Sequence, residues 1–571
     1  MSDKDLASIA EARVLARRAK LAQATLAEFS QEQIDRIVEA MATAVLPHAE
    51  ALARLAVEET TFGVVADKTQ KNVFAAQRVF EFIKPMKTVG VINRIEDRKI
   101  IEIAEPFGVV AAVIPSTNPT STAIYKILIA IKARCAVVMT PHPSAARCIT
   151  CTADIMNEAG RKAGLPDGAI GWMSTVTLEG TQELMKAREV SVILATGGMG
   201  LVRAAYSAGK PAYGVGPGNA PCYIESSADL RKAASDILTG KAFDNGVLCS
   251  SPNSVVVDAA VEAEARRQFK DQGGHFLSAA ESDTLAKQLV TPQRLPNPAF
   301  VGKSAVYIAE KVGIAVPAGT RALIAELKGV GRDFPLSIEK LCPVLSYYVV
   351  KDWREGCERC KQILKYGGMG HTMSIHSQND AVILEFGLHK PAYRICVNTP
   401  TTHGSIGLTT GLDPAMTLGC GGFGGNITSD NISPKHLLNI KRVAYELRPA
   451  VQTSVPEVPT VVVPSTTVPA LPKAPHKPRP DSISADALTS RIDKFLATRG
   501  LAPSAPAALE SFAPQVPKVP AVAETFVCEE DVRLAAREGR TLLIGERTIV
   551  TPSARDAGEA AKVFVHAGWL P

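Results

Sequence analysis

Apolar stretches of strand length alternate with helical stretches over the first 448 residues of the chain. Unbroken apolar runs at 107–115, 135–141 and 190–196 have the length of buried strands. The segments 124–133 and 144–164 between them have helical spacing. Strands that alternate with helices of this length form βαβ units, so the pattern predicts an α/β fold with a parallel sheet. Such sheets bind ligands beyond the carboxyl ends of their strands, which directs attention to the loops after them.

The pattern changes after residue 448. Eight of the thirty residues from 451 to 480 are proline, and a second stretch rich in proline and alanine ends at residue 523. Proline fixes φ and removes backbone donors, so we predict an extended linker over 451–523. Within it, 484–499 places four apolar side chains on one helix face, which predicts a short amphipathic helix.

Residues 524–571 are predicted to form a small C-terminal module. Its sequence indicates a helix that begins near residue 529, two short strands at 541–545 and 547–551, and a last helix near 554–567.

Composition narrows the partners that we expect. The 571 residues include 63 basic and 57 acidic side chains, a net charge of +6 without a run of five basic residues. We therefore expect no nucleic-acid partner. The most apolar stretch, 123–139, contains three basic residues and is shorter than the ~20 residues that cross a bilayer, so we expect no membrane span.

The eleven cysteines are expected to be thiols. Two pairs have the CxxC spacing of zinc ligands, Cys148 with Cys151 and Cys357 with Cys360. The first pair lies in a run with helical spacing, and neither pair has a glycine-rich knuckle beside it. Packing is therefore favoured over zinc, and we predict no metal site.

Two glycine-rich loops suggest a nucleotide site. ATGGMG, at 195–200, follows a predicted strand and opens a helix, where backbone N–H groups can approach a phosphate or ribose. GVGPGN follows at 214–219. The spacing is not the GxGxxG fingerprint, and a tight turn explains the first loop equally well.

Among the cysteines, Cys249 has the best context for a nucleophile. It lies in FDNGVLCSSPN, a loop with glycine, asparagine and small hydroxyl residues. Cys420, in LGCGGFGG, is the rival because glycines leave it accessible too. Asn118, in STNPT, can donate to an oxyanion or can simply start a turn. His371, in GMGHTMSIHS, suits a site wall, although a lone histidine is more often structural.

Six motifs together resemble the CoA-acylating aldehyde dehydrogenases. This group includes the aldehyde dehydrogenase half of bifunctional aldehyde–alcohol dehydrogenases and the propionaldehyde dehydrogenases of bacterial microcompartments. The resemblance covers about residues 10–448 and implies a three-layer α/β fold. The motifs are PSTNPTSTAIYKIL, ATGGMGLVRAAYSAGKPAYGVGPGN, KAFDNGVLCSSPNSVVV, EKLCPVLSYY, GGMGHTMSIHS and LGCGGFGGN…PKHLLNIKRVA.

The resemblance also implies a division of the chain. A Rossmann-type cofactor domain is expected at 1–225, with an oligomerisation hairpin at about 87–105. A catalytic domain is expected at 226–430 and an oligomerisation segment at 431–450. A homo-oligomer, either a dimer or a dimer of dimers, follows from the same resemblance.

Site roles follow from the resemblance as well. Cys249 is expected to be the nucleophile that forms a thioester, Asn118 the donor to the oxyanion, and His371 a proton acceptor for a thiol. The cofactor-binding residues that it implies are Pro115, His142, Thr196, Gly197, Gly198 and Glu339.

The expected acyl acceptor is coenzyme A. Hydrolytic relatives carry a glutamate general base where this chain reads GVGPGN, without a carboxylate. Water attack should then be slow, and a thiol, with a pKa near ~8.5, is a better acceptor. We expect NAD as the dinucleotide, with NADP possible because no acidic residue follows the strand at 135–141. Propionaldehyde is the expected substrate, and acetaldehyde is the alternative.

The helix 484–499 resembles the encapsulation peptides of microcompartment enzymes. It is expected to dock on shell proteins, which implies a cytoplasmic protein inside a bacterial microcompartment. The expected pathway is propanediol utilisation through a glycyl-radical enzyme, and the alternative is ethanolamine or choline utilisation, which supplies acetaldehyde. Alternatively the helix packs back on its own catalytic body. A second hypothesis is a non-catalytic scaffold with a shell-docking tail, against which the joint presence of Cys249, Asn118 and Glu339 argues.

Overall fold

A computed structural model describes residues 2–448 and 524–566. These residues belong to two compact units that divide between residues 454 and 455, and each unit is described by itself. The predicted linker 451–523 and its helix 484–499 lie outside the described residues.

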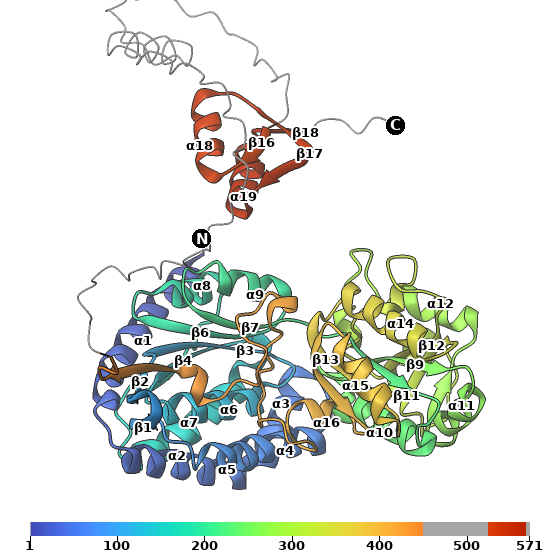
Figure 1. The fold of residues 1–571 in the computed structure, drawn as a ribbon, viewed down its shortest axis with the longest axis horizontal. Helices are drawn as coiled ribbons and strands as arrows, with labels where there is room; N and C mark the ends of the chain where they lie inside the picture. The colour runs from blue at the N-terminus through green and yellow to red at the C-terminus, as the bar shows by residue number, and fades with distance from the viewer. Residues whose placement is uncertain (1, 449–523, 567–571) are drawn as a thin grey trace, which may run out of the picture. The chain divides into compact units, whose positions relative to one another are not determined.

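The larger unit begins with helices and contains a five-stranded parallel sheet that has helices on both faces (Figure 1). The apolar runs predicted from the sequence form its central strands, and their side chains are buried, as in sheets covered on both faces. The strands in order across the sheet are β5 (Ile170–Trp172), β4 (Ala136–Pro141), β3 (Val109–Ile114), β6 (Val190–Thr196) and β7 (Ala212–Val215). Its helices are α1 (Asp3–Ala27), α2 (Gln31–Val45), α3 (Ala49–Thr60), α4 (Val65–Val73), α5 (Val79–Ile83), α6 (Pro119–Lys132), α7 (Ala146–Lys162), α8 (Leu178–Lys186) and α9 (Met199–Tyr206).

A second parallel sheet of seven strands follows in the chain. Its strands in order are β10 (Gly274–Phe276), β11 (Ala322–Glu326), β12 (Val344–Val350), β9 (Pro252–Asp258), β8 (Ala220–Ile224), β13 (Gly370–His376) and β14 (Ala392–Val397). Its helices are α10 (Leu230–Ala242), α11 (Glu262–Asp271), α12 (Ala279–Leu289), α13 (Ala305–Val312), α14 (Trp353–Tyr366), α15 (Asp380–Leu388) and α16 (Thr401–Ser405). Two parallel sheets with helices on their faces give the predicted α/β class.

The predicted domain boundaries differ from the packing at both ends of the second sheet. The boundary at 225 falls after β8, yet β8 pairs with β9 and β13 of the larger sheet. The predicted catalytic domain runs to 430, yet Ile406, Ala415 and Leu418 are buried in the core of the first sheet. The chain therefore returns to the first core soon after α16, because these apolar side chains are buried there.

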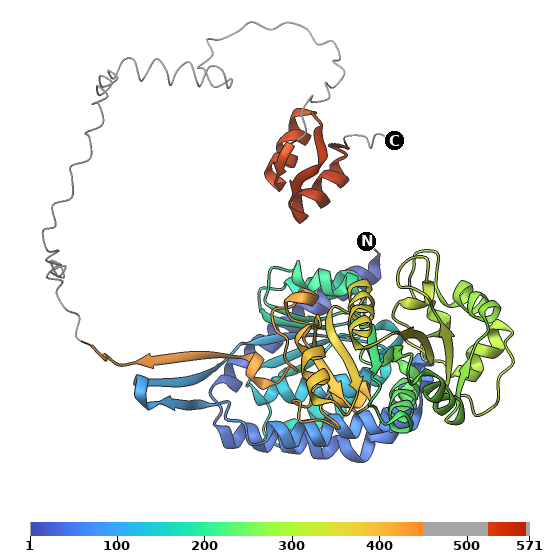
Figure 2. The ribbon, with the colours of Figure 1, turned by 45° about the vertical axis from the view of Figure 1, so that its right-hand side comes forward.

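A third, antiparallel sheet projects from the larger unit (Figure 2). It consists of the hairpin β1 (Gly90–Ile95) and β2 (Ile100–Pro106) together with β15 (Leu438–Ala444), which pairs with β2. It joins the two segments that the sequence analysis names as oligomerisation elements.

The small unit is a three-stranded parallel sheet with two helices, α18 (Glu529–Glu538) and α19 (Pro552–Ala561). Its strands are β16 (Glu524–Val527), β17 (Leu542–Val550) and β18 (Phe564–His566). Two predictions were wrong here. A single strand replaces the two short ones, because the Gly545 N–H donates to Thr548 Oγ1 and the ladder continues through a bulge. The last helix ends at Ala561, because Lys562 adopts a left-handed φ of 53° and β18 follows.

Among the described residues, we find no helix that is both long enough and apolar enough to cross a membrane.

Candidate active site

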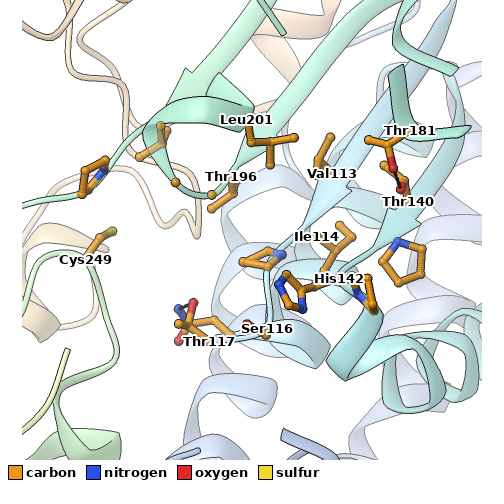
Figure 3. Close-up of a pocket in the computed structure, with 18 of the residues that line it drawn as sticks. Val113, Ile114, Ser116, Thr117, Thr140, His142, Thr181, Thr196, Leu201 and Cys249 are labelled. Carbon is orange, nitrogen blue, oxygen red and sulfur yellow. Dashed lines mark hydrogen bonds between the residues drawn. The ribbon is translucent and has the colours of Figure 1, made fainter. Parts of the chain in front are cut away.

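A cavity of about 490 Å³ lies at the carboxyl ends of β3, β4, β6 and β7. Its opposite wall comes from the loop of Cys249 and from residues near 339–341. In Figure 3, Cys249 lies at one end of the labelled residues, Thr140 and Thr181 at the other, and Thr196 between them. The predicted site residues that line this cavity are Pro115, Asn118, His142, Thr196, Gly197, Gly198, Cys249 and Glu339.

Cys249 follows a tight loop that links α10 to β9. Asp244 and Asn245 in this loop have φ values of 50° and 52°, in the left-handed region. Burial and, as a smaller cause, the negative charge of Glu339 raise the pKa of the Cys249 thiol to about 12. The thiol is therefore neutral near pH 7 in the ligand-free protein. Its attack on a carbonyl requires a proton acceptor or a change in its surroundings.

Asn118 precedes the first turn of α6, where Pro119 fits because its missing N–H has no partner in a helix. The Asn118 side chain does not cap the helix. Its Oδ1 accepts a hydrogen bond of 2.6 Å from Lys71 Nζ, and its Nδ2 lies 3.2 Å from Thr117 Oγ1. The amide NH2 group therefore keeps one N–H for a ligand in the cavity.

Glu339 is half-buried and faces the same cavity. Its Oε1 accepts a hydrogen bond of 2.8 Å from the Gly218 N–H. Burial raises the pKa of Glu339 to about 7, against the opposing effects of this hydrogen bond and of nearby Lys241. A carboxylate with this pKa changes its charge close to neutral pH.

The loop after β6 has the features of a cradle for a ribose or phosphate. Thr196 Oγ1 is a buried oxygen without a hydrogen-bond partner. Gly198 has open space where a side chain would begin, and α9 starts at the next residue. A helix start favours negative charge. His142, at the end of β4, is exposed, and its Nδ1 lies 2.8 Å from Ser144 Oγ.

His371 does not line the cavity wall, contrary to the expectation that it suits one. Gly218 lies between it and the nucleophile: a Cβ there would be 2.0 Å from the Cys249 carbonyl oxygen and 3.5 Å from His371 Cγ. The imidazole Nδ1 is 2.9 Å from Thr372 Oγ1, while Nε2 is buried without a partner. Burial lowers the pKa of His371 to about 3, so the ring is neutral.

The other cysteines that the sequence singles out lie away from the cavity lining. Cys420 is buried, with Sγ 3.6 Å from the Leu418 carbonyl oxygen. In the CxxC pairs, Cys148 Sγ contacts a backbone carbonyl and Cys357 Sγ contacts Lys390. Across residues 2–448 and 524–566, no group of three or more His, Cys, Asp or Glu side chains is placed to hold a metal ion.

Sequence reasoning missed three charged residues beside the site, Lys68, Lys71 and Asp244. Both lysines belong to α4 and form ion pairs with the aspartate, which lies in the loop before Cys249. The lysines are three residues apart and so share a helix face. A lysine pair on a helix is normally solvated, so the spacing alone does not distinguish burial from exposure.

Several known proteins resemble this chain in sequence and in fold. The model of the aldehyde dehydrogenase family matches residues 3–279. The bifunctional aldehyde-alcohol dehydrogenase AdhE of Escherichia coli is 41% identical over 442 residues, which are 76% of this chain and 50% of that protein. The chain thus spans about half the length of that relative.

Two solved structures extend the likeness. The acetylating aldehyde dehydrogenase of Geobacillus thermoglucosidasius is 48% identical, with a TM-score of 0.78, and covers 79% of this chain and 100% of its own. A propionaldehyde dehydrogenase from the Clostridium phytofermentans fucose utilisation bacterial microcompartment is 29% identical, with a TM-score of 0.68, over 75% of this chain and 96% of its own.

The chain belongs to the aldehyde dehydrogenase family. The match to the family model and the 48% identity to a solved aldehyde dehydrogenase that is covered over its whole length support this assignment.

Proposed function

We propose that the protein oxidises a short aldehyde and transfers the acyl group to coenzyme A, with a nicotinamide dinucleotide as the hydride acceptor. One observation carries the proposal: a thiol, Cys249, and an amide donor, Asn118, face one cavity in which Glu339 is the sole carboxylate among the lining residues of the described chain. The 214–219 stretch supplies no carboxylate to activate water. A thioester on Cys249 therefore awaits a better nucleophile than water.

The chain's own residues divide the chemistry between them. Cys249 Sγ attacks the aldehyde carbon, and the oxygen that becomes negative accepts a hydrogen bond from Asn118 Nδ2. Such a donor contributes about 10²–10³ in rate. Thr196, Gly197, Gly198 and Glu339 are the residues that would hold the dinucleotide, which when bound accepts the hydride. We propose NAD, and NADP is tested beside it because His142 replaces an acidic residue at the end of β4.

The aldehyde is the finer part of the proposal. The sequence resemblance favours propionaldehyde. The Geobacillus thermoglucosidasius enzyme, which is 48% identical to this chain, is instead an acetylating aldehyde dehydrogenase, and the propionaldehyde dehydrogenase of Clostridium phytofermentans is 29% identical. We therefore propose a two- or three-carbon aldehyde, to be tested with acetaldehyde and propionaldehyde in parallel.

Hydrolysis of the thioester is a second candidate, and Glu339 is the observation in its favour. Its pKa of about 7 would suit a general base that activates water. Against this role, Glu339 Oε1 is already engaged by the Gly218 N–H.

One assay tests the proposal and separates it from hydrolysis. NADH formation is followed with each aldehyde, with and without coenzyme A, in the wild type and in Glu339→Gln. We expect turnover that requires coenzyme A and an acyl-CoA product identified by mass spectrometry. Turnover without coenzyme A that disappears in Glu339→Gln would establish the hydrolytic reaction instead. No turnover with either aldehyde would favour the scaffold hypothesis.

Location inside a microcompartment and docking through 484–499 also belong to the proposal. Deletion of 481–500 should leave catalysis unchanged and abolish co-purification with shell proteins. Unchanged co-purification would contradict the docking role.

A further inference from the structure

Two buried lysines lie behind the wall of the cavity. Lys68 and Lys71 of α4 are each 2% exposed, and both ammonium groups form ion pairs with Asp244, which has no exposed surface. We call these three residues the lysine–aspartate cluster. Lysine is seldom buried, and a buried charge needs partners that offset its lost hydration. Packing alone therefore does not explain why two lysines are buried at this position.

The two lysines differ in what else they contact. Lys68 Nζ donates to the Thr117 backbone oxygen at 3.0 Å. Lys71 Nζ donates to the side-chain oxygen of Asn118 at 2.6 Å. Lys71 is thus the member of the cluster that contacts the side-chain amide of Asn118, a residue that lines the cavity.

This contact selects one of two orientations of the Asn118 amide. An asparagine amide can rotate by half a turn, which exchanges its oxygen and its NH2 group. After such a rotation, the NH2 group would face the ammonium of Lys71, donor against donor. Lys71 therefore holds the oxygen on its own side and leaves the NH2 group for the site. A protonated partner on the oxygen also polarises the amide, which strengthens its N–H as a donor.

Asp244 extends the same linkage to the nucleophile. It lies five residues before Cys249, in the loop that leads to it. Besides the two lysines, its Oδ1 accepts a hydrogen bond of 2.7 Å from the Val64 N–H, and its own N–H donates to Asp67 Oδ2 at 2.7 Å. These contacts join the start of α4 to the loop of Cys249.

We propose that Lys71 is a positioning residue that fixes the Asn118 amide with its NH2 group toward the substrate oxygen and, through Asp244, ties this donor to the loop of Cys249. The inference rests on the proposed function, because it assigns the amide to the oxyanion of that reaction.

The test is a double-mutant cycle between Lys71 and Asn118 in the full chain. We expect Lys71→Met to lower kcat about 10- to 100-fold, with the aldehyde KM nearly unchanged, because the hydrogen bond from Asn118 to the oxyanion, which Lys71 positions, forms only in the transition state. Asn118→Ala should lower kcat by about 10²–10³. In the Asn118→Ala background, Lys71→Met should lower kcat by less than about threefold, since a residue that acts through Asn118 has nothing left to position.

Lys68→Met is the matched control. It removes the same charge from the same helix and the same aspartate, but Lys68 does not contact the Asn118 side chain. We expect Lys68→Met to lower kcat less than Lys71→Met does. In the double variant with Asn118→Ala, the effects of Lys68→Met and Asn118→Ala should be additive. Thermal unfolding and the rate of Cys249 alkylation establish that each variant is folded with its thiol accessible.

The pH profile gives a second readout. Burial lowers the pKa of Lys71 to about 8, and the charged groups that face it are Asp244, Lys68 and Asp67. Lys71 is protonated below this pKa, so kcat should fall as the pH rises through about 8. This decline should be absent in Lys71→Met.

The outcomes separate this inference from the proposed function. A wild type without coenzyme A-dependent turnover contradicts the proposed function and, with it, the role of Lys71. An active wild type in which Lys71→Met keeps full kcat, or loses as much in the Asn118→Ala background as alone, overturns the positioning role and leaves the proposed function intact.

Discussion

Two carboxylates near Cys249 are held in opposite ways. Asp244 is fully buried, and both of its ammonium partners contact it directly. Glu339 is half-buried, faces the cavity and accepts one hydrogen bond, from the Gly218 N–H. Burial without an ion pair favours the neutral form of a carboxylate. Burial accordingly raises the pKa of Glu339 to about 7.

The two carboxylates therefore have different roles: Asp244 holds parts of the site in place, and Glu339 can change its charge near neutral pH. Asp244 forms the ion pairs that connect α4 and Asn118 to the loop of Cys249. Loss of its charge should therefore lower the free energy of unfolding. Glu339 can gain or lose its charge near neutral pH. Loss of this charge should therefore change the ionisation of the Cys249 thiol in the same cavity. The following substitutions test this division.

The largest effect should come from the Cys249 thiol itself. Cys249→Ala removes the nucleophile, and we expect kcat to fall at least about 10⁴-fold while unfolding is unchanged. Steady-state NADH formation with coenzyme A present measures the loss. Cys420→Ala is the control and should keep its activity, because Cys420 is absent from the cavity lining. If Cys420→Ala were inactive and Cys249→Ala active, the nucleophile would be Cys420.

Asp244→Asn should give the largest change in stability. The substitution removes the one carboxylate that forms ion pairs with both buried ammonium groups, and breaking a buried pair in this way costs about 3–5 kcal/mol. Glu339→Gln is the matched change of a carboxylate to its amide, and we expect a cost below about 1 kcal/mol because no ion pair is lost. Urea unfolding followed by intrinsic fluorescence measures both. Equal costs would remove the distinction between the two carboxylates.

Gly63 offers a smaller perturbation of Asp244 that leaves its charge intact. A Cβ at Gly63 would lie 1.9 Å from Asp244 Oδ1, and the residue has a φ of 80°. Gly313 has a nearly equal φ of 77° but no atom within 4 Å of the same position. Both alanine variants bear left-handed strain of about 1–2 kcal/mol, and Gly63→Ala should cost about 1–3 kcal/mol more from overpacking.

The activity of the same pair sharpens the test. Gly63→Ala should lower kcat, because displacement of Asp244 disturbs both Lys71 and the loop of Cys249. Gly313→Ala should retain wild-type kcat. A Gly63→Ala variant with normal kcat would show that Asp244 can move without consequence for the site.

Much of this architecture could be predicted from apolar patterning. The apolar runs that became β3, β4 and β6 are long enough to mark buried parallel strands. Asn118 lies in the loop after β3, and Thr196 is the last residue of β6. The pattern could not assign β8 to a sheet, since a short apolar run is equally suited to either. Pairing with β9 and β13 decides that question.

The lysine–aspartate cluster was beyond such reasoning for a different reason. Lys71 and Asp244 are 173 residues apart, and neither has a local environment that distinguishes it from a solvated charge. Their burial depends on each other. A charged side chain can be buried only when the fold brings an oppositely charged partner beside it. A single sequence does not reveal which distant residue that partner is.

The smallest effect tests the titratable carboxylate directly. The negative charge of Glu339 raises the pKa of the Cys249 thiol, so Glu339→Gln should lower that pKa and increase the thiolate fraction at a given pH. We expect alkylation of Cys249 by iodoacetamide at pH 8 to be a few-fold faster, on the order of 1 kcal/mol for charges in a partly solvated cavity. Mass spectrometry of the peptide that contains Cys249 measures the rate. Glu225→Gln is the control: it neutralises a buried carboxylate that contacts only serines and does not line the cavity. An equal acceleration in both variants would mean that a general loosening of the fold, and not the charge of Glu339, controls the thiol.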